Sequence, residues 1–457
     1  MELGDTLPVW SIIPFAGMLL SIALFPLFKP AWWERHQLHV AAFWSLLFLV
    51  PFTIAYGFGV TYEQLLESIV VDYIPFIVLL FGLFVVAGGI AIKGTIAGTP
   101  KVNALLLLIG TVLSSWIGTT GAAMLLIRPV LRANAWRQKK AHVVVFFIFL
   151  VANMGGCLTP LGDPPLFLGY LRGVPFFWTI EHILPILILN AVILLAVFFI
   201  MDTIMYKRET AAGRSPSDLM EEGGKSPIRI EGAHNFIFLA LIILAVILNG
   251  SIPNMPFFQD ASGQVLGVTV PGSDVFLGAQ YFIQIALILV AAFCSSATTK
   301  QSVRHLNDFN YDAIAEVARL FIGIFITMIP ALAILRAHGG DIGIDTPLEF
   351  FWATGALSSF LDNSPTYVVF MTAAGSLGAT EGLVTTVGTV GVANLLAVSA
   401  GAVFMGANTY IGNAPNFMVK NIAESKGVKM PSFFGYIGWA VCILIPVFII
   451  DSLLFFL

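Results

Sequence analysis

The sequence predicts an all-α polytopic membrane protein with two inverted repeats, each carrying a re-entrant helical hairpin and a broken transmembrane helix. Hydrophobic residues make up 58% of the 457 residues and charged residues only 11%, whereas a soluble domain carries about 25% charge. Many apolar runs reach the roughly 20 residues that span a bilayer. Polar, helix-breaking stretches also recur at matching places in the two halves of the chain.

Two gapless alignments define the repeat. Residues 113–120 (LSSWIGTT) match residues 357–364 (LSSFLDNS), and residues 156–167 (GCLTPLGDPPLF) match residues 406–417 (GANTYIGNAPNF). Backbone groups that a broken helix leaves free need partners, and within a bilayer only a protein-lined or wet cavity supplies them. Apolar segments interrupted at corresponding places are therefore the best sequence indication of a transport site.

The first repeat covers residues 1–206. Its apolar runs predict spans at 10–28, 39–56 and 70–92, a hairpin at 103–131, a broken span at 142–170 and a span at 183–205. Each hairpin arm of about 12–14 residues is roughly 20 Å long and ends near mid-membrane. The stretch before residue 10 is acidic and lacks the basic region of a signal peptide, so the first run is predicted to be a span.

Residues 207–233 are rich in Gly, Ser and charge and are predicted to form a cytoplasmic linker. The second repeat covers residues 234–457. Its predicted elements are spans at 234–250, 281–298 and 311–335, a hairpin at 347–375, a broken span at 391–424 and a last span at 433–455. We assign no function to the outer loop 251–280.

The distribution of Lys and Arg predicts the orientation. With the N-terminus outside and hairpins that enter and leave on one side, only Arg172 and Arg336 fall outside and only Arg128 and Arg319 fall within membrane segments. This is a strong positive-inside bias. It predicts a multi-pass protein of the bacterial inner membrane with both termini outside, and it makes the two repeats inverted.

The hairpin tips and helix breaks provide the candidate site. Asp, Asn, Ser and Thr oxygens cap helix N-termini, and together with unwound backbone carbonyls they also suit a Na⁺ ion. Capping alone is the alternative role. The candidate ion- or substrate-binding residues are Gly118, Thr119, Thr120, Thr159, Gly162, Asp163, Asp362, Asn363, Ser364, Thr366, Asn408, Thr409 and Asn413. Among them, the candidate Na⁺ ligands are Thr119, Thr120, Asp163, Asp362, Asn363 and Asn413.

Asp163 and Asp362 are the candidates for proton coupling. Placing a carboxylate inside a membrane costs free energy, so such a residue indicates function by default. Each aligns with a neutral residue in the other half, since Asp362 matches Gly118 and Asp163 matches Asn413. If a proton and Na⁺ compete for one carboxylate, binding of either ion displaces the other, and this is the simplest basis for exchange of Na⁺ for H⁺.

These motifs resemble those of the ion transporter superfamily, which includes sodium–dicarboxylate cotransporters, arsenite permeases and NhaD-type sodium/proton antiporters. The resemblance covers nearly the whole chain and rests on GTT at 118–120, DNS at 362–364, TPLGDPP at 159–165 and NTYIGNAP at 408–415. The most similar variety is a bacterial group labelled either sodium/proton antiporter or citrate transporter. The resemblance implies a homodimer with a fixed scaffold and a moving, elevator-type transport domain.

The chain departs from dicarboxylate transporters, whose tips are neutral. Asp163 and Asp362 repel a di- or trianion, and neither tip has a Lys or Arg, although helix N-termini can hold one substrate carboxylate. We therefore expect a secondary transporter that exchanges Na⁺ for H⁺. Citrate or dicarboxylate symport is the second reading and arsenite efflux the third.

Other classes fit the sequence less well. Channels show symmetric filters rather than an inverted repeat with two inequivalent carboxylates, and no nucleophile–base set indicates an enzyme. The sequence also has no credible nucleotide motif. We expect no cofactor besides the ions Na⁺ and H⁺, no nucleic-acid partner, contact with membrane lipid, and transport driven by an ion gradient.

Overall fold

The computed structural model describes residues 3–216 and 226–457. Within these residues the regular structure is mostly α-helix with a few short strands. Nine helical segments of this described part are long and apolar enough to cross a membrane. The predicted all-α polytopic membrane fold is therefore confirmed.

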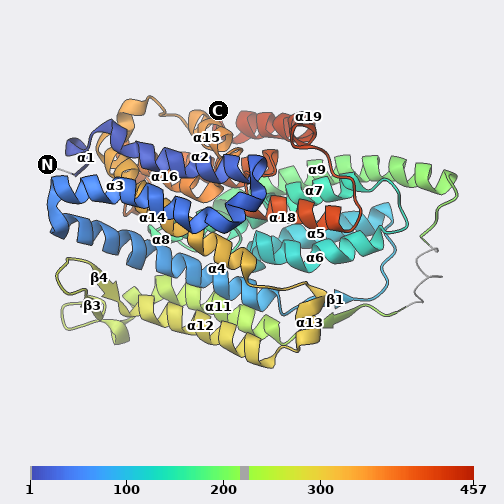
Figure 1. Cartoon of the computed structure of the whole chain (residues 1–457), viewed down its shortest axis with the longest axis horizontal. Helices are drawn as coiled ribbons and strands as arrows, with labels where there is room; N and C mark the ends of the chain where they lie inside the picture. The colour runs from blue at the N-terminus through green and yellow to red at the C-terminus, as the bar shows by residue number, and fades with distance from the viewer. Residues whose placement is uncertain (1–2, 217–225) are drawn as a thin grey trace.

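One group of helices, here called the frame, contains the first three spans of each half. In Figure 1, α3, α14, α4, α11 and α12 follow one another from top to bottom. The packing agrees, because α14 contacts α2, α3 and α4, and α12 contacts α4 and α11. The frame helices are α1 (Leu3–Thr6), α2 (Ile13–Phe28), α3 (Pro30–Leu66), α4 (Ile74–Ala87), α11 (Asn235–Ser251), α12 (Ala279–Thr298), α13 (Gln301–Leu306) and α14 (Asp312–His338).

The helix α3 is longer than the predicted span at 39–56. It begins at Pro30, and it runs through a kink at Gly57, whose φ of 85° lies in the left-handed region that Gly adopts readily. The polar residues before position 39 suggested a loop. Instead, Gln37 is buried and its amide donates to Glu316 of α14 at 2.6 Å, so this polarity serves a helix–helix contact.

The second group, here called the core, contains the hairpins, the broken helices and the last span of each half. Its first-half helices are α5 (Pro100–Ile117), α6 (Thr119–Ala133), α7 (Ala141–Leu150), η3 (Met154–Leu158), α8 (Pro164–Leu171) and α9 (Trp178–Ala211). Its second-half helices are α15 (Pro347–Ser358), α16 (Asn363–Ser376), α17 (Val392–Met405), η7 (Gly406–Asn408), α18 (Ala414–Ser425) and α19 (Phe433–Asp451), which η8 (Ser452–Phe456) extends. The inverted relation of the halves stays a prediction.

The linker region differs in detail from the prediction. The helix α9 continues to Ala211, beyond the predicted start of the linker at residue 207. The strand β2 (Arg229–Glu231) pairs antiparallel with β1 (Ala91–Lys93). Part of the predicted linker, residues 217–225, lies outside the described residues. Two further hairpins pair β3 (Gly267–Thr269) with β4 (Phe276–Gly278) and β5 (Leu383–Thr385) with β6 (Gly388–Val390).

The core meets the frame along a few helices. The helix α16 packs on α14, and α4 packs on both α6 and α8. Arg172 follows the C-terminal end of α8 and forms an ion pair with Asp72 of η2 (Glu67–Tyr73), with 2.7 Å between Nη2 and Oδ2. The junction is therefore mainly apolar helix packing with a charged contact at its edge.

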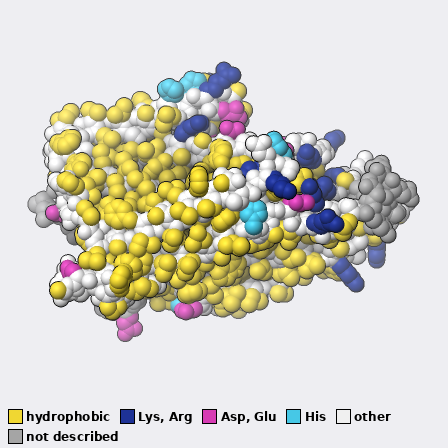
Figure 2. Space-filling model, turned by 90° about the horizontal axis from the view of Figure 1, so that it is seen from below, with side chains coloured by type: hydrophobic (Ala, Val, Ile, Leu, Met, Phe, Trp, Pro, Cys, Tyr) yellow, Lys and Arg dark blue, Asp and Glu magenta, His cyan; other side chains and the backbone are white. Residues whose placement is uncertain are grey.

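The face of the molecule seen in Figure 2 is strongly apolar. Large side chains on several helices, such as Ile54, Phe293 and Phe434, are between 74% and 81% exposed. Soluble monomers rarely expose such broad apolar patches, so these apolar surfaces face lipid. Many Lys and Arg side chains gather toward the end of the molecule where α9 ends (Figures 1 and 2). The protein is a multi-pass membrane protein.

Candidate functional site

At each of the two motifs predicted to be hairpin tips, one helix ends and the next begins. The chain reverses between α5 and α6 at Gly118, whose φ of 78° and ψ of 150° leave the helical region. It reverses again between the end of α15 at Ser358 and the start of α16 at Asn363. Thr119 and Asn363 therefore begin the second arms of the two hairpins, and they occupy matching positions in the repeat.

In the first half, the tip is hydrogen bonded to the break. The backbone N–H of Thr119 donates to the carbonyl of Gly162 at 2.8 Å. The hydroxyl of Thr159 donates to the carbonyl of Ser115, and it accepts from the N–H of Leu161 at 3.1 Å. The backbone groups freed by the broken helix thus find partners inside the protein, as a membrane interior requires.

The second half repeats the hydroxyl contacts of Thr159 at the matching position, Thr409. The hydroxyl of Thr409 donates to the carbonyl of Ser359 at 2.5 Å and accepts from the N–H of Ile411 at 3.2 Å. Asn408 also donates from Nδ2 to the Ser359 hydroxyl at 2.9 Å. The repeated sequence motifs therefore correspond to repeated hydrogen bonds between a tip and its break.

Asp163 joins the tips and breaks of both halves. Its Oδ2 accepts from Asn363 Nδ2 at 2.7 Å. Its Oδ1 accepts from the Thr119 hydroxyl at 3.3 Å and from Asn413 Nδ2 at 3.4 Å. All four residues are at most 3% exposed. We call them the tip–break cluster. They form two pairs of matching positions, Thr119 with Asn363 and Asp163 with Asn413.

The cluster lies at the N-terminal ends of four helices. Thr119 begins α6 and Asn363 begins α16, while Asp163 and Asn413 are the residues just before α8 and α18. A helix N-terminus carries partial positive charge and favours an anion. The Asp163 side chain makes no capping bond to its own helix, so capping alone does not explain this carboxylate.

Further amides extend the cluster. Asn413 Nδ2 approaches Asn153 Oδ1 at 3.3 Å, and Asn153 Nδ2 donates to Asn416 Oδ1 at 2.7 Å. Asn416 Nδ2 in turn donates to the carbonyls of Gly406 and Thr409 at 2.8 and 2.9 Å. This chain of amides connects the break of one half to the break of the other.

Four candidate residues are not hydrogen bonded to Asp163. The half-buried Asp362 caps α16, because its Oδ1 accepts from the N–H of Ser364 at 2.9 Å. The Thr366 hydroxyl donates to the Asp362 carbonyl at 2.9 Å. The Ser364 hydroxyl lies 3.4 Å from Asn363 Oδ1. Thr120 is half-buried beside the first tip, and the structure gives it no hydrogen bond to the cluster.

Sequence reasoning missed the two serines and two of the asparagines that support the site. Ser115 and Ser359 occupy matching positions in the aligned motifs, so the signal was present. Asn153 and Asn416 do not align with each other, and only their polarity within apolar segments distinguishes them. Both are fully buried.

The cluster itself contains one carboxylate, Asp163, among neutral hydroxyl and amide groups, and a second carboxylate, Asp362, adjoins it through Asn363. Among residues 3–216 and 226–457, no group of three or more His, Cys, Asp and Glu side chains lies close enough to hold a metal ion. The described hydrogen bonds and ion pairs give Asp163 no Lys or Arg partner. Any cation bound here would therefore meet one carboxylate, amide and hydroxyl oxygens, and backbone carbonyls.

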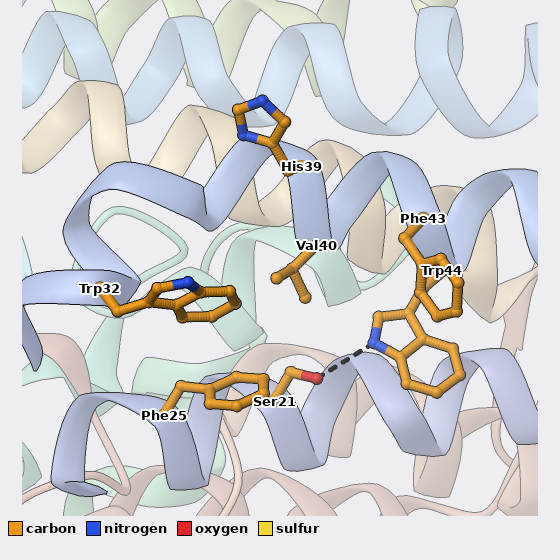
Figure 3. A pocket seen from close by; sticks show the side chains of 7 residues that line it. All are labelled: Ser21, Phe25, Trp32, His39, Val40, Phe43 and Trp44. Atoms are coloured by element: carbon orange, nitrogen blue, oxygen red, sulfur yellow. Dashed lines mark hydrogen bonds between the residues drawn. The ribbon is translucent and has the colours of Figure 1, made fainter. Parts of the chain in front are cut away.

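A groove of about 240 Å³ lies elsewhere, between α2 and α3. Aromatic residues such as Phe25, Trp32 and Trp44 line it, and the Trp44 indole donates to the Ser21 hydroxyl at 3.0 Å (Figure 3). No hairpin or break residue lines the groove. It belongs to the apolar surface of the frame and not to the candidate site.

A membrane-embedded core in which two helical hairpins and two broken helices meet at buried polar groups defines a membrane transporter. The comparison with known families agrees with this class. The chain belongs to the family described as "Putative citrate transport", whose model matches residues 4–456. A search of the curated proteins finds no match.

Proposed function

We propose that the protein exchanges Na⁺ for H⁺ across the membrane and that Asp163 binds one cation or the other. One observation carries the proposal: Asp163 is fully buried and accepts hydrogen bonds from three neutral side chains, but it has no Lys or Arg among its described contacts. A buried ionised carboxylate without a cationic partner is strongly unfavourable. A proton or a metal cation removes that penalty.

The helix ends shape the competition between the two cations. Four N-termini stabilise negative charge at Asp163 by a fraction of a charge each, which keeps an ionised state accessible when Na⁺ binds. They oppose additional positive charge, which favours a monovalent ion over a divalent one. The carboxylate and the helix ends together therefore suit a site that alternates between a proton and Na⁺.

The amides of the cluster can serve both states. In the structure, Asn363 and Asn413 direct Nδ2 toward Asp163. A half-turn of each amide group presents Oδ1 instead, since the amide carries both donors and an acceptor. Asp163, the two amide oxygens and the Thr119 hydroxyl would then supply oxygen ligands to Na⁺. Asp362 positions Asn363 by capping α16, so we assign it a supporting role.

Citrate transport is the second candidate function. The description of the family favours it, and four helix N-termini suit a carboxylate ligand as well. In this reading the Asp163 carboxylate repels the substrate unless it binds the coupling H⁺ or Na⁺. The homodimer, the elevator movement and the orientation in a bacterial inner membrane remain part of the proposal.

Purified protein in liposomes with an internal pH dye and an imposed proton gradient separates the two functions. Addition of NaCl or LiCl, compared with KCl and then with sodium citrate, is the decisive series. We expect a proton flux with NaCl alone that Asp163→Asn abolishes. A flux that requires citrate would reject sodium/proton exchange and support the second candidate.

A further inference from the structure

Two further fully buried carboxylates, Asp202 and Asp451, lie outside the tip–break cluster, and Asp451 is the one without a charged partner. Asp451 ends α19 and Asn190 lies on α9, and both are 0% exposed. Asn190 Nδ2 donates to Asp451 Oδ2 at 2.9 Å. The remaining oxygen of each side chain, Oδ1 in both residues, is buried and has no hydrogen-bond partner within the described residues.

Two unpartnered oxygens in one bonded pair are unusual, because about 90% or more of buried polar groups are hydrogen bonded. If Asp451 were ionised, Oδ1 of Asp451 and Oδ1 of Asn190 would both be acceptors, and neither could donate a hydrogen bond to the other. A single proton on Asp451 Oδ1 turns that atom into a donor. Asn190 Oδ1, on the side chain already bonded to Asp451, is a buried acceptor without a partner that such a donor could serve.

The surroundings of Asp451 supply no compensating positive charge. The helix α9 packs on α19, and α15 packs on η8 beside it. The titratable groups on these elements are Glu181, His182, Asp202, Tyr206, Lys207, Arg208 and Glu209 on α9, Glu349 on α15, and Tyr436 and Cys442 on α19. None of them is hydrogen bonded or ion-paired to Asp451 in the described structure, where Asn190 is the contact of its carboxyl group.

Asp202 on the same helix α9 gives the contrast. It is also 0% exposed, but it forms an ion pair with Arg137. Its Oδ1 lies 2.8 Å from His142 Nε2, and its Oδ2 accepts a hydrogen bond from Asn103 Nδ2 at 3.0 Å. A buried carboxylate with such partners is held ionised. Asp451 has the same burial with a single neutral partner, so burial favours its neutral form.

We propose that Asp451 and Asn190 form a proton-binding site separate from the tip–break cluster, and that Asp451 carries a proton in this conformation. The proton comes from water and returns to water, and no bond other than O–H forms or breaks. This inference does not depend on whether the transported substrate is Na⁺ or citrate. It adds a second membrane carboxyl group that can take up and release a proton.

Infrared difference spectroscopy of the purified protein tests the proposal. The spectrum of wild type minus Asp451→Asn should contain a carboxylic-acid C=O band, and Asp260→Asn, an exposed carboxylate used as the control, should remove carboxylate bands only. Asn190→Leu keeps Asp451 but removes its partner, so the acid band should shift to higher frequency. Loss of carboxylate bands instead of the acid band in Asp451→Asn would overturn the proposal. If that variant does not fold, an unshifted spectrum in Asn190→Leu would overturn it.

Discussion

Asn363 at the tip of the second hairpin donates a 2.7 Å hydrogen bond to Asp163 at the break of the first half, across 200 residues of sequence. This contact joins the tip motif of the second half to the break motif of the first half, so the motifs of the two halves do not form two separate clusters. A single carboxylate instead receives donors from both halves. The position of Asn363 therefore sets the charge environment of Asp163, and the following predictions depend on that relationship.

Removal of the Asp163 carboxylate should abolish exchange while the protein still folds. Asn at position 163 keeps the size of the side chain and can still accept from Asn363, but it cannot bind a proton or neutralise Na⁺. Proteoliposome flux should fall to the protein-free background in Asp163→Asn. Asp362→Asn should reduce flux less, because Asn remains a good N-cap for α16. Equal loss in both variants would mean that Asp362 takes part directly.

Loss of the Asn363 amide should weaken Na⁺ binding. Asn363→Ala leaves Asp163 Oδ2 without its donor and removes one oxygen ligand. A missing partner for a buried polar group costs about 1–3 kcal/mol, so the apparent KM for Na⁺ should rise by roughly 5- to 150-fold. Asp260→Asn, in the exposed outer loop, is the control and should leave KM unchanged. An unchanged KM in Asn363→Ala would separate this residue from the ion site.

Acid should inhibit exchange by competition. A proton on Asp163 excludes Na⁺, so the apparent KM for Na⁺ should increase as pH falls below the range in which Asp163 ionises. The increase should approach about tenfold per pH unit, since one unit is worth about 1.36 kcal/mol of proton binding. The maximal rate at saturating Na⁺ should change less. Flux measured with equal pH on both sides gives both constants, and a falling maximal rate at constant KM would argue against competition at one carboxylate.

Replacement of Ser115 and replacement of Ser359 should lower the free energy of unfolding by about the same amount. Ser115 Oγ donates to Gly155 and accepts from the N–H of Leu158. Ser359 Oγ lies 2.7 Å from the carbonyl of Gly355 and 3.1 Å from that of Met405, and it accepts from Asn408. Replacement of either serine by Ala leaves buried groups unpartnered, which should lower stability by about 1–3 kcal/mol. Thermal unfolding in detergent measures this effect, with the exposed Ser302→Ala as control. A neutral result for one serine alone would show that the two halves are not equivalent.

The buried ion pair between Arg137 and Asp202 should stabilise the contact between the loop after α6 and the helix α9. Asp202→Asn leaves the Arg137 guanidinium, 2% exposed, without its counter-charge, and breaking such a pair costs about 3–5 kcal/mol. The double variant Arg137→Leu, Asp202→Asn should recover part of the loss because no unpaired charge remains. Melting temperatures of the single and double variants test this, and a double variant less stable than Asp202→Asn would contradict it.

The sequence was sufficient for the fold class, because hydropathy and low charge act along the whole chain. The repeated motifs also indicated where the hairpin tips and helix breaks lie. Span boundaries were less predictable. The polar residues around Gln37 suggested a loop, but their partner Glu316 lies on α14, far away in sequence. Local polarity does not reveal whether a side chain meets water or another helix.

The different surroundings of the two aspartates were also beyond the sequence. Asp362 and Asp163 had equivalent signals, since each is a carboxylate where the other half is neutral. The difference comes from tertiary packing: Asp362 turns to its own helix, whereas Asp163 meets residues from three other segments. Asn153 and Asn416 were missed for the same reason, because their roles depend on contacts between the two breaks.

Proton release on addition of Na⁺ is the most direct test of the central claim that the two cations compete for Asp163. Sodium chloride would be added to purified protein in weakly buffered solution with a pH indicator, with choline chloride as the salt control. We predict proton release from the wild type and from Asp260→Asn, and none from Asp163→Asn. Equal release from Asp163→Asn, or no release from the wild type at any pH at which it is folded, would contradict the claim.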